Sequence, residues 1–176
     1  MILMMIIQRA GRAMSKPEAQ FWDFLQSESV LTLATTDICG SWSAPVLYVA
    51  DWLKDRPVLY FLSSPNSRHI KHLPPNGAAS ASIYADYSGN WLAIRGLQMH
   101  GHIESVCDQD RDDWESAYFA RFPEVADIID KPSNDQEHKM AAAFKKTGYY
   151  IFNPAYIRST DNSDQFANRR EWHFSK

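Results

Sequence analysis

Short apolar runs separated by turn residues dominate the chain from residue 30 to residue 106. Val, Leu, Ile, Tyr and Phe favour strands, and Gly, Pro, Asn, Asp and Ser end them. The turn at 37–40 pairs Asp37 with Gly40, which suggests a hairpin. A bend or a close approach is expected at Gly96 and Gly101, where no side chain stands in the way. We therefore predict strands over 30–35, 44–50, 57–62, 79–85 and 90–106, with closing strands over 149–160 and 170–174.

Helical signals frame these strands. Ser15, Pro17 and Glu18 form a capping box, and the helix that they open is expected to end near 27–29. A second helix is predicted over 108–122, where aspartates at the start suit the helix dipole. Ser133 and Gln136 open another, which Gly148 ends.

Strands that follow one another without alternating long helices favour an antiparallel α+β barrel over a doubly wound sheet. The seven glycines form neither a phosphate-binding loop of the G-x-x-x-x-G-K-[ST] kind nor a G-x-G-x-x-G fingerprint. A chain of 176 residues fits one domain, which we assign to residues 15–176. Residues 1–14 are expected to be disordered or an over-called extension, because Met14 is the better start.

Composition limits which binding partners and which cellular location are expected. The formal net charge of −3 argues against a nucleic-acid partner, since such contacts need a basic surface. The apolar run before Gln8 is too short to span a membrane. Cys39 and Cys107 give no disulfide framework, which predicts a cytoplasmic protein with buried or idle thiols.

The stretch that carries candidate chemistry is 58–83, "VLYFLSSPNSRHIKHLPPNGAASASI". Its strand ends in Ser63, and a turn then delivers Ser67, Arg68 and His69 to the start of a short helix. Hydroxyls, free helix N–H groups and a guanidinium together predict a phosphate-binding site. The alternative is that Asn66 merely caps the helix while Arg68 and His69 lie in water.

This order of features resembles the flavin-mononucleotide (FMN)-binding split barrels related to pyridoxamine-phosphate oxidase, over most of residues 15–176. In that family a Ser-Arg-Lys motif after the strand holds the flavin phosphate. Ser63, Ser67, Arg68 and His69 match those positions, and Leu62 completes the strand end. His69 replaces the usual Lys, so the second positive charge depends on pH.

The resemblance implies further contacts with the flavin. The segment Pro45, Val46, Leu47 and Tyr48 resembles the strand whose backbone follows the isoalloxazine ring. Arg95 or Gln98 is the candidate side chain that reaches the flavin from across a homodimer with two flavins at its interface. Trp172 either stacks on the flavin or clamps the last strand. The ending at Thr160, Asp161 and Asn162 resembles a less-characterised branch of the family.

The resulting prediction is an FMN-dependent oxidoreductase that acts on a small molecule or takes electrons from NADH or NADPH. Arg169, Arg170 and His173 lack the Arg-x-His spacing of authentic pyridoxamine-phosphate oxidases, which argues against that reaction. The alternatives are a non-catalytic flavin-binding or haem-binding protein, favoured only by His100 and His102, and a barrel without flavin. No metal site is predicted, because these two histidines lack a third ligand.

Overall fold

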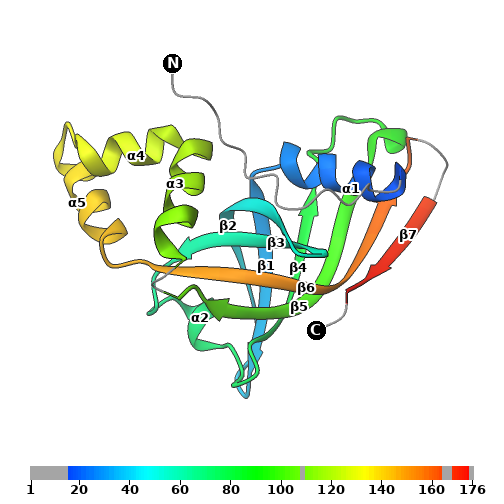
Figure 1. Cartoon of the computed structure of the whole chain (residues 1–176), viewed down its shortest axis with the longest axis horizontal. Coiled ribbons are helices and arrows are strands. Elements are labelled where there is room, and N and C mark those ends of the chain that lie inside the picture. Colours follow the sequence, from blue (N-terminus) through cyan, green and yellow to red (C-terminus); the bar gives the residue numbers. More distant parts are fainter. Residues whose placement is uncertain (1–15, 108–109, 164–167, 175–176) are drawn as a thin grey trace.

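The fold is an α+β split barrel, seen in a computed structural model that describes residues 16–107, 110–163 and 168–174 (Figure 1). The predicted helix cap Ser15 and the predicted extension 1–14 lie outside the described residues. Seven antiparallel strands form one sheet in the order β3-β2-β1-β4-β5-β6-β7. They are β1 (Val30–Asp37), β2 (Gly40–Leu53), β3 (Arg56–Ser63), β4 (Ala78–Tyr84), β5 (Arg95–Ser105), β6 (Gly148–Asp161) and β7 (Asn168–His173).

Strand β6 closes the sheet into a ring. One of its edges pairs with β5, and the other pairs first with β3 over Gly148–Phe152 and then with β7 over Tyr156–Asp161. The register shifts where His100 faces Tyr156 but Gly101 faces Pro154. A Cβ atom on Gly101 would collide with the carbonyl oxygen of Asn153. The predicted close approach at Gly101 is thus confirmed, as is the split-barrel prediction.

Helices flank the barrel at two places (Figure 1). Helix α1 lies beside the end of β6 and β7, and α3, α4 and α5 gather at the opposite end of the molecule. The single-turn helix α2 follows β3. Their bounds are α1 (Lys16–Ser27), α2 (Arg68–Lys71), α3 (Arg111–Arg121), α4 (Pro123–Asp130) and α5 (Asp135–Phe144).

Three details of the predicted elements need correction. The long strand over 90–106 begins as a 3-10 turn at Trp91–Ala93, because the Asn90 side chain accepts a hydrogen bond from the Leu92 N–H. Helix α4 was not predicted, and Pro123 starts it directly after α3. Helix α5 is capped by Asn134 instead of Ser133, through the Glu137 N–H at 3.0 Å.

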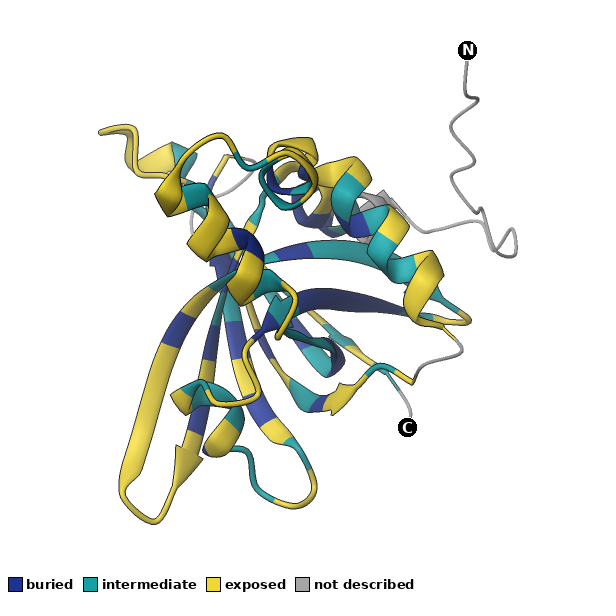
Figure 2. Ribbon diagram, turned by 90° about the vertical axis from the view of Figure 1, so that its left-hand side faces the viewer, coloured by how far each residue is buried: buried dark blue, intermediate teal, exposed yellow. Residues whose placement is uncertain are grey.

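The main core fills the barrel beneath α1. Phe24 of α1 packs with Leu33, Phe61 and Phe152 from three strands, all nearly inaccessible to solvent. The Tyr48 hydroxyl donates to the Leu25 carbonyl at 2.7 Å and so ties β2 to α1. Figure 2 shows that burial is greatest where the strands cross, while their far ends extend into solvent.

A second cluster covers the outside of β2 and β3. Tyr118 of α3, Phe122 between α3 and α4, and Val125 of α4 are buried there, with Leu47 and Leu62 packed against them. Arg121 at the end of α3 donates to the Gln26 carbonyl at 2.8 Å and so satisfies the last turn of α1.

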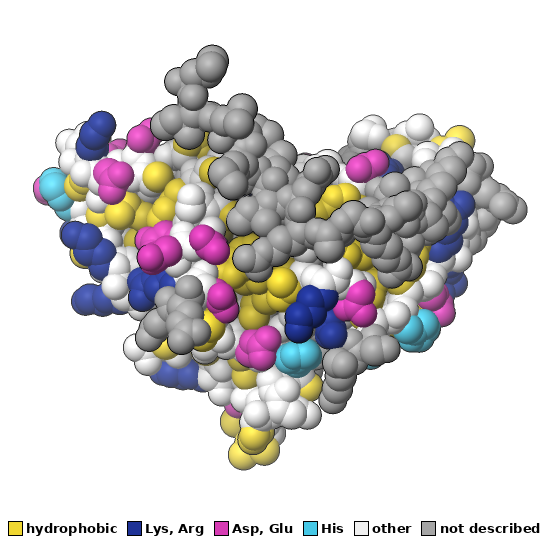
Figure 3. All heavy atoms as spheres, viewed as in Figure 1, with side chains coloured by type: hydrophobic (Ala, Val, Ile, Leu, Met, Phe, Trp, Pro, Cys, Tyr) yellow, Lys and Arg dark blue, Asp and Glu magenta, His cyan; other side chains and the backbone are white. Residues whose placement is uncertain are grey.

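The surface is mixed in charge. On the face drawn in Figure 3, acidic, basic and hydrophobic side chains are all exposed. Cys39 and Cys107 are both free and exposed, so of the two predicted alternatives, buried or idle thiols, burial does not hold; each lies next to a turn or helix start and not in a core strand. Of the helices in the described ranges, none is long and apolar enough to cross a membrane.

Candidate functional site

A cluster of two hydroxyls and one imidazole forms where β3 ends. The Ser63 Oγ lies 3.0 Å from the Ser67 Oγ and 2.7 Å from the His69 Nε2. The Ser67 Oγ is also 3.2 Å from the same ring nitrogen. We call Ser63, Ser67 and His69 the hydroxyl–imidazole cluster. Its three polar atoms lie within 3.2 Å of one another.

The turn between β3 and α2 builds this cluster. The Ser67 N–H donates to the Ser64 carbonyl at 2.9 Å, and the Asn66 N–H donates to the Ser64 hydroxyl at 3.2 Å. These bonds fold the chain back so that Ser67 meets Ser63. Ser67, and not Asn66, is the N-cap residue, and its side chain makes no capping hydrogen bond. Its hydroxyl therefore remains part of the cluster.

Helix α2 has only four residues, so its dipole adds little. Any anion held here depends on side chains. Burial lowers the pKa of His69 from its ordinary value, because a charged ring loses solvation there. His69 is thus neutral near neutral pH. Of the basic pair that the resemblance implied, Arg68 alone carries a full charge under those conditions.

Arg68 is exposed and lies between Ser67 and His69 in the chain, and its side chain is turned toward Trp42 at the start of β2. Its Nε donates to the His72 Nε2 at 3.1 Å, and its Cζ lies 4.2 Å from the centre of the Trp42 ring. No hydrogen bond joins Arg68 to Ser63, Ser67 or His69 within the described segments. In those same segments the Nη1 and Nη2 atoms make no hydrogen bond or ion pair. The guanidinium therefore offers its two-nitrogen edge to a ligand.

The four candidate residues on β2 have different environments. Pro45 is exposed on the outer face, while Val46 packs against the main core. Leu47 lies against the α3–α4 cluster, as does Leu62 of β3. Tyr48 is buried with its hydroxyl bonded to Leu25, and burial raises its pKa. The Tyr48 side chain is therefore part of the core, and only the backbone of this residue can face a ligand.

Arg95 and Trp172 lie together but at the α1 end of the barrel. Both line a pocket of about 70 Å³ with Ser159 and Thr160. Arg95 forms an ion pair with Asp161 at 3.0 Å, and the Trp172 ring lies 4.6 Å from that of Phe21. The contact with Phe21 fits the interpretation of Trp172 as a clamp on the last strand.

Gln98 is exposed on the outer face of β5, between Ser82 of β4 and Arg158 of β6. Further along β5, His100 stacks on Tyr156 with ring centres 5.1 Å apart, and Tyr156 contacts His173 at the same separation. No group of three or more metal-ligating side chains occurs among the residues that the structure describes.

Three residues near Arg68 were missed by the sequence interpretation. His72 is four residues after Arg68, so its position on the same helix face was available as a signal. Asp37 was assigned only to a turn, yet its Oδ2 lies 3.3 Å from the His72 Nε2. Trp42 reaches Arg68 through tertiary packing, and nothing in the local sequence indicates that contact.

Comparison with known proteins supports the fold. No protein-family model and no curated protein matches the chain. Among solved structures it resembles ChuZ from Campylobacter jejuni, with a TM-score of 0.67, 12% identity, and coverage of 93% of this chain and 61% of that one. It also resembles a heme binding protein from Mycobacterium smegmatis, with a TM-score of 0.59, 19% identity and coverage of 84% and 53%.

An FAD-binding protein from Mesorhizobium loti matches with a TM-score of 0.57 and 15% identity, over 84% of this chain and 95% of that one. The chain spans less than two thirds of the length of the first two proteins. At these identities the matches establish a fold shared with flavin-binding and heme-binding proteins.

Proposed function

We propose that this protein binds FMN and that the flavin phosphate lies between Arg68 and the hydroxyl–imidazole cluster. The observation that carries the proposal is the open edge of the guanidinium of Arg68, a residue that directly follows Ser67 in the turn after β3. A guanidinium edge matches phosphate oxygens, and hydroxyls donate to those oxygens. The described site carries one full cation there, which suits a terminal phosphate.

The ring system is proposed to follow the backbone of β2 from Pro45 to Tyr48, as the family resemblance implies. In the described strands, β2 pairs with β3 only from Tyr48 onward, which leaves that edge of β2 unpaired before Tyr48, and the partly buried Leu47 and Leu62 lie close by. Bound flavin supplies electron transfer, while the chain supplies anchoring and packing. An oxidoreductase that uses a small substrate, NADH or NADPH follows from that chemistry.

A homodimer is part of this proposal. Several large apolar side chains are exposed in the described part of the chain, and an interface with a second copy would cover them. They include Val30, Tyr84, Tyr87, Trp91 and Leu92. Arg95 and Gln98 would reach a flavin only from such a partner.

Titration of the purified protein with FMN, riboflavin and FAD tests the proposal. We expect the flavin absorbance band to shift and FMN to bind more tightly than riboflavin, because only FMN offers a phosphate to Arg68. Anaerobic NADH or NADPH then bleaches the bound flavin if the protein is an oxidoreductase. Failure of FMN to bind would overturn the proposal, and binding without bleaching by any donor would leave a flavin-binding protein.

Haem binding is the second candidate, favoured by the stack of His100, Tyr156 and His173 on the outer face. Imidazole and phenolate side chains are both haem-iron ligands in proteins. Haemin titration should then give a Soret band that His100→Ala abolishes and Arg68→Ala leaves intact. An unchanged spectrum in His100→Ala would rule out this ligand.

A further inference from the structure

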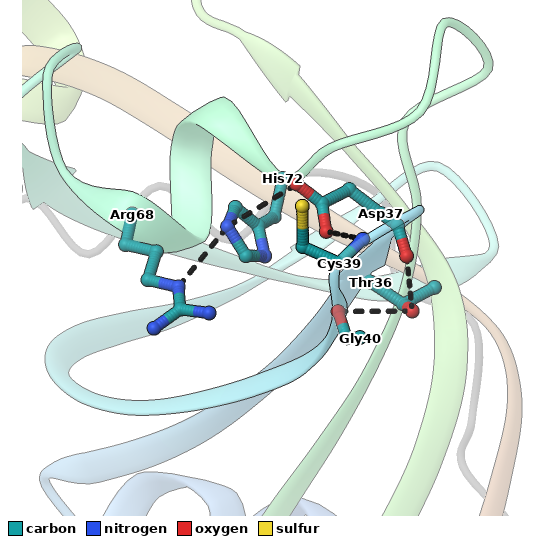
Figure 4. A network of polar contacts seen from close by, with 6 residues as sticks. All are labelled: Thr36, Asp37, Cys39, Gly40, Arg68 and His72. Atoms are coloured by element: carbon teal, nitrogen blue, oxygen red, sulfur yellow. Dashed lines mark hydrogen bonds and ion pairs between the residues drawn. The ribbon is translucent and has the colours of Figure 1, made fainter.

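The Arg68 side chain is held by contacts that leave its ligand-binding edge open. Its Nε donates to His72, and its planar group lies over the Trp42 ring. An exposed arginine otherwise samples many rotamers, and that freedom is lost when it binds an anion. Contacts to Nε and to the flat face restrict the side chain in advance. Figure 4 shows Arg68 pointing to His72.

His72 is itself fixed from the opposite side. It is only 8% exposed, and its Nε2 lies 3.3 Å from the Asp37 Oδ2. The second carboxylate oxygen of Asp37 accepts the Cys39 backbone N–H at 2.8 Å within the β1–β2 turn (Figure 4). The β1–β2 hairpin thus fixes the Asp37 carboxylate, which in turn contacts the His72 imidazole.

The position of one imidazole proton decides which contact His72 makes. A single ring nitrogen cannot accept from Arg68 and donate to Asp37 at once. With the proton on Nδ1, the Nε2 lone pair accepts from Arg68. With the proton on Nε2, the hydrogen bond goes to Asp37 and the Arg68 Nε–H loses its acceptor. The Nδ1 atom is buried without a partner in the part of the chain described.

We propose that His72 is a positioning residue for Arg68, with Trp42 as the platform beneath the guanidinium. In the anion-bound protein the His72 proton lies on Nδ1, Nε2 accepts from the Arg68 Nε, and the Nη1 and Nη2 edge faces the phosphate. This inference rests on the proposed FMN function and names residues that the family resemblance did not supply.

The test compares FMN with riboflavin in four proteins: wild type, His72→Leu, His72→Gln and Trp42→Leu. We expect His72→Leu and Trp42→Leu to weaken FMN binding about three- to tenfold, the range for losing the restriction of one flexible side chain. Riboflavin affinity should not change. His72→Gln should restore FMN binding, since its amide oxygen can accept from the Arg68 Nε.

A double-mutant cycle separates positioning from general structure. In an Arg68→Ala background, His72→Leu should cause no further loss of FMN affinity. Long-range ¹H–¹⁵N spectra of wild type with FMN should report His72 protonated on Nδ1 and not on Nε2. If His72→Leu does not fold, two measurements still test the inference: FMN binding by Trp42→Leu, whose side chain is exposed, and the ¹H–¹⁵N spectrum of His72 in the wild type.

Each remaining outcome counts against the inference. Equal losses for FMN and riboflavin, a further loss in the Arg68→Ala background, or a proton on Nε2 would overturn it. An unchanged FMN affinity in His72→Leu would overturn the positioning role alone, with FMN binding intact. A wild type that binds no FMN would overturn the proposed function, and this inference with it.

Discussion

Replacing His69 by Lys should strengthen FMN binding at alkaline pH. Burial lowers the pKa of His69, so the ring is neutral there and gives the phosphate no charge. A lysine supplies a permanent cation at the position where the FMN-binding split barrels that the sequence resembles carry Lys. A hydrogen bond to a charged group contributes about 1.5 to 3 kcal/mol. Because His69 is only partly buried, we expect about 1.5 kcal/mol, or about tenfold in Kd.

The pH dependence of this gain follows from the sign of the shift. A bound phosphate favours the charged imidazole and raises its pKa, so wild-type affinity benefits from protonation as pH falls. The gain in FMN affinity of His69→Lys over wild type should therefore be largest at about pH 8 and should shrink toward about pH 5.5. The phosphate also gains a proton in this range, which weakens its attraction to the lysine and so reduces the advantage of His69→Lys in the same direction.

Fluorescence titration of wild type and His69→Lys with FMN at both pH values measures the effect, with riboflavin as the control ligand. An equal gain for riboflavin would show that the lysine acts on the ring or on the fold. An absence of any FMN gain at the higher pH would mean that no phosphate approaches residue 69.

The other predictions concern Arg68 and the barrel. Arg68→Ala should weaken FMN by about 1.5 to 3 kcal/mol in the same titration, without changing riboflavin affinity; an unchanged FMN Kd would remove Arg68 from the site. Tyr48→Phe leaves the buried Leu25 carbonyl without its 2.7 Å donor, which should cost about 1 to 2 kcal/mol and lower Tm by about 2 to 8 °C. The exposed Tyr84→Phe is its control, and equal melting shifts would contradict the role of the Tyr48 hydroxyl. Gly101→Ala should cost about 1 to 3 kcal/mol by denaturant unfolding, because the added methyl meets the Asn153 carbonyl; stability equal to that of the exposed Ser80→Ala would argue against the close approach.

The barrel was predictable from the sequence because its signals are local. Alternating small and large residues in 79–85 gave β4, and the Asp37–Gly40 turn gave the hairpin. The closure through β6 was not predictable in detail, since pairing of one strand with three others depends on tertiary contacts. Pro123 explains the missed helix: a proline marks a break, but it also begins a helix at its first position.

The site residues, like the strands, were predictable where the sequence signal is local and not where tertiary packing places them. Ser63, Ser67 and His69 come together because one short turn connects them, and sequence spacing indicates such turns. The orientation of Arg68 required knowledge of Trp42, which approaches from another strand. Arg95 and Trp172 lie at the α1 end, a location that strand patterns alone do not define.

A crystal structure of the protein grown with FMN is the most direct test of the phosphate site. The account predicts phosphate oxygens within hydrogen-bonding distance of the Arg68 Nη atoms and of a hydroxyl from Ser63 or Ser67, with His72 still bonded to the Arg68 Nε. A flavin bound with its phosphate elsewhere, or an Arg68 edge facing only solvent, would contradict it.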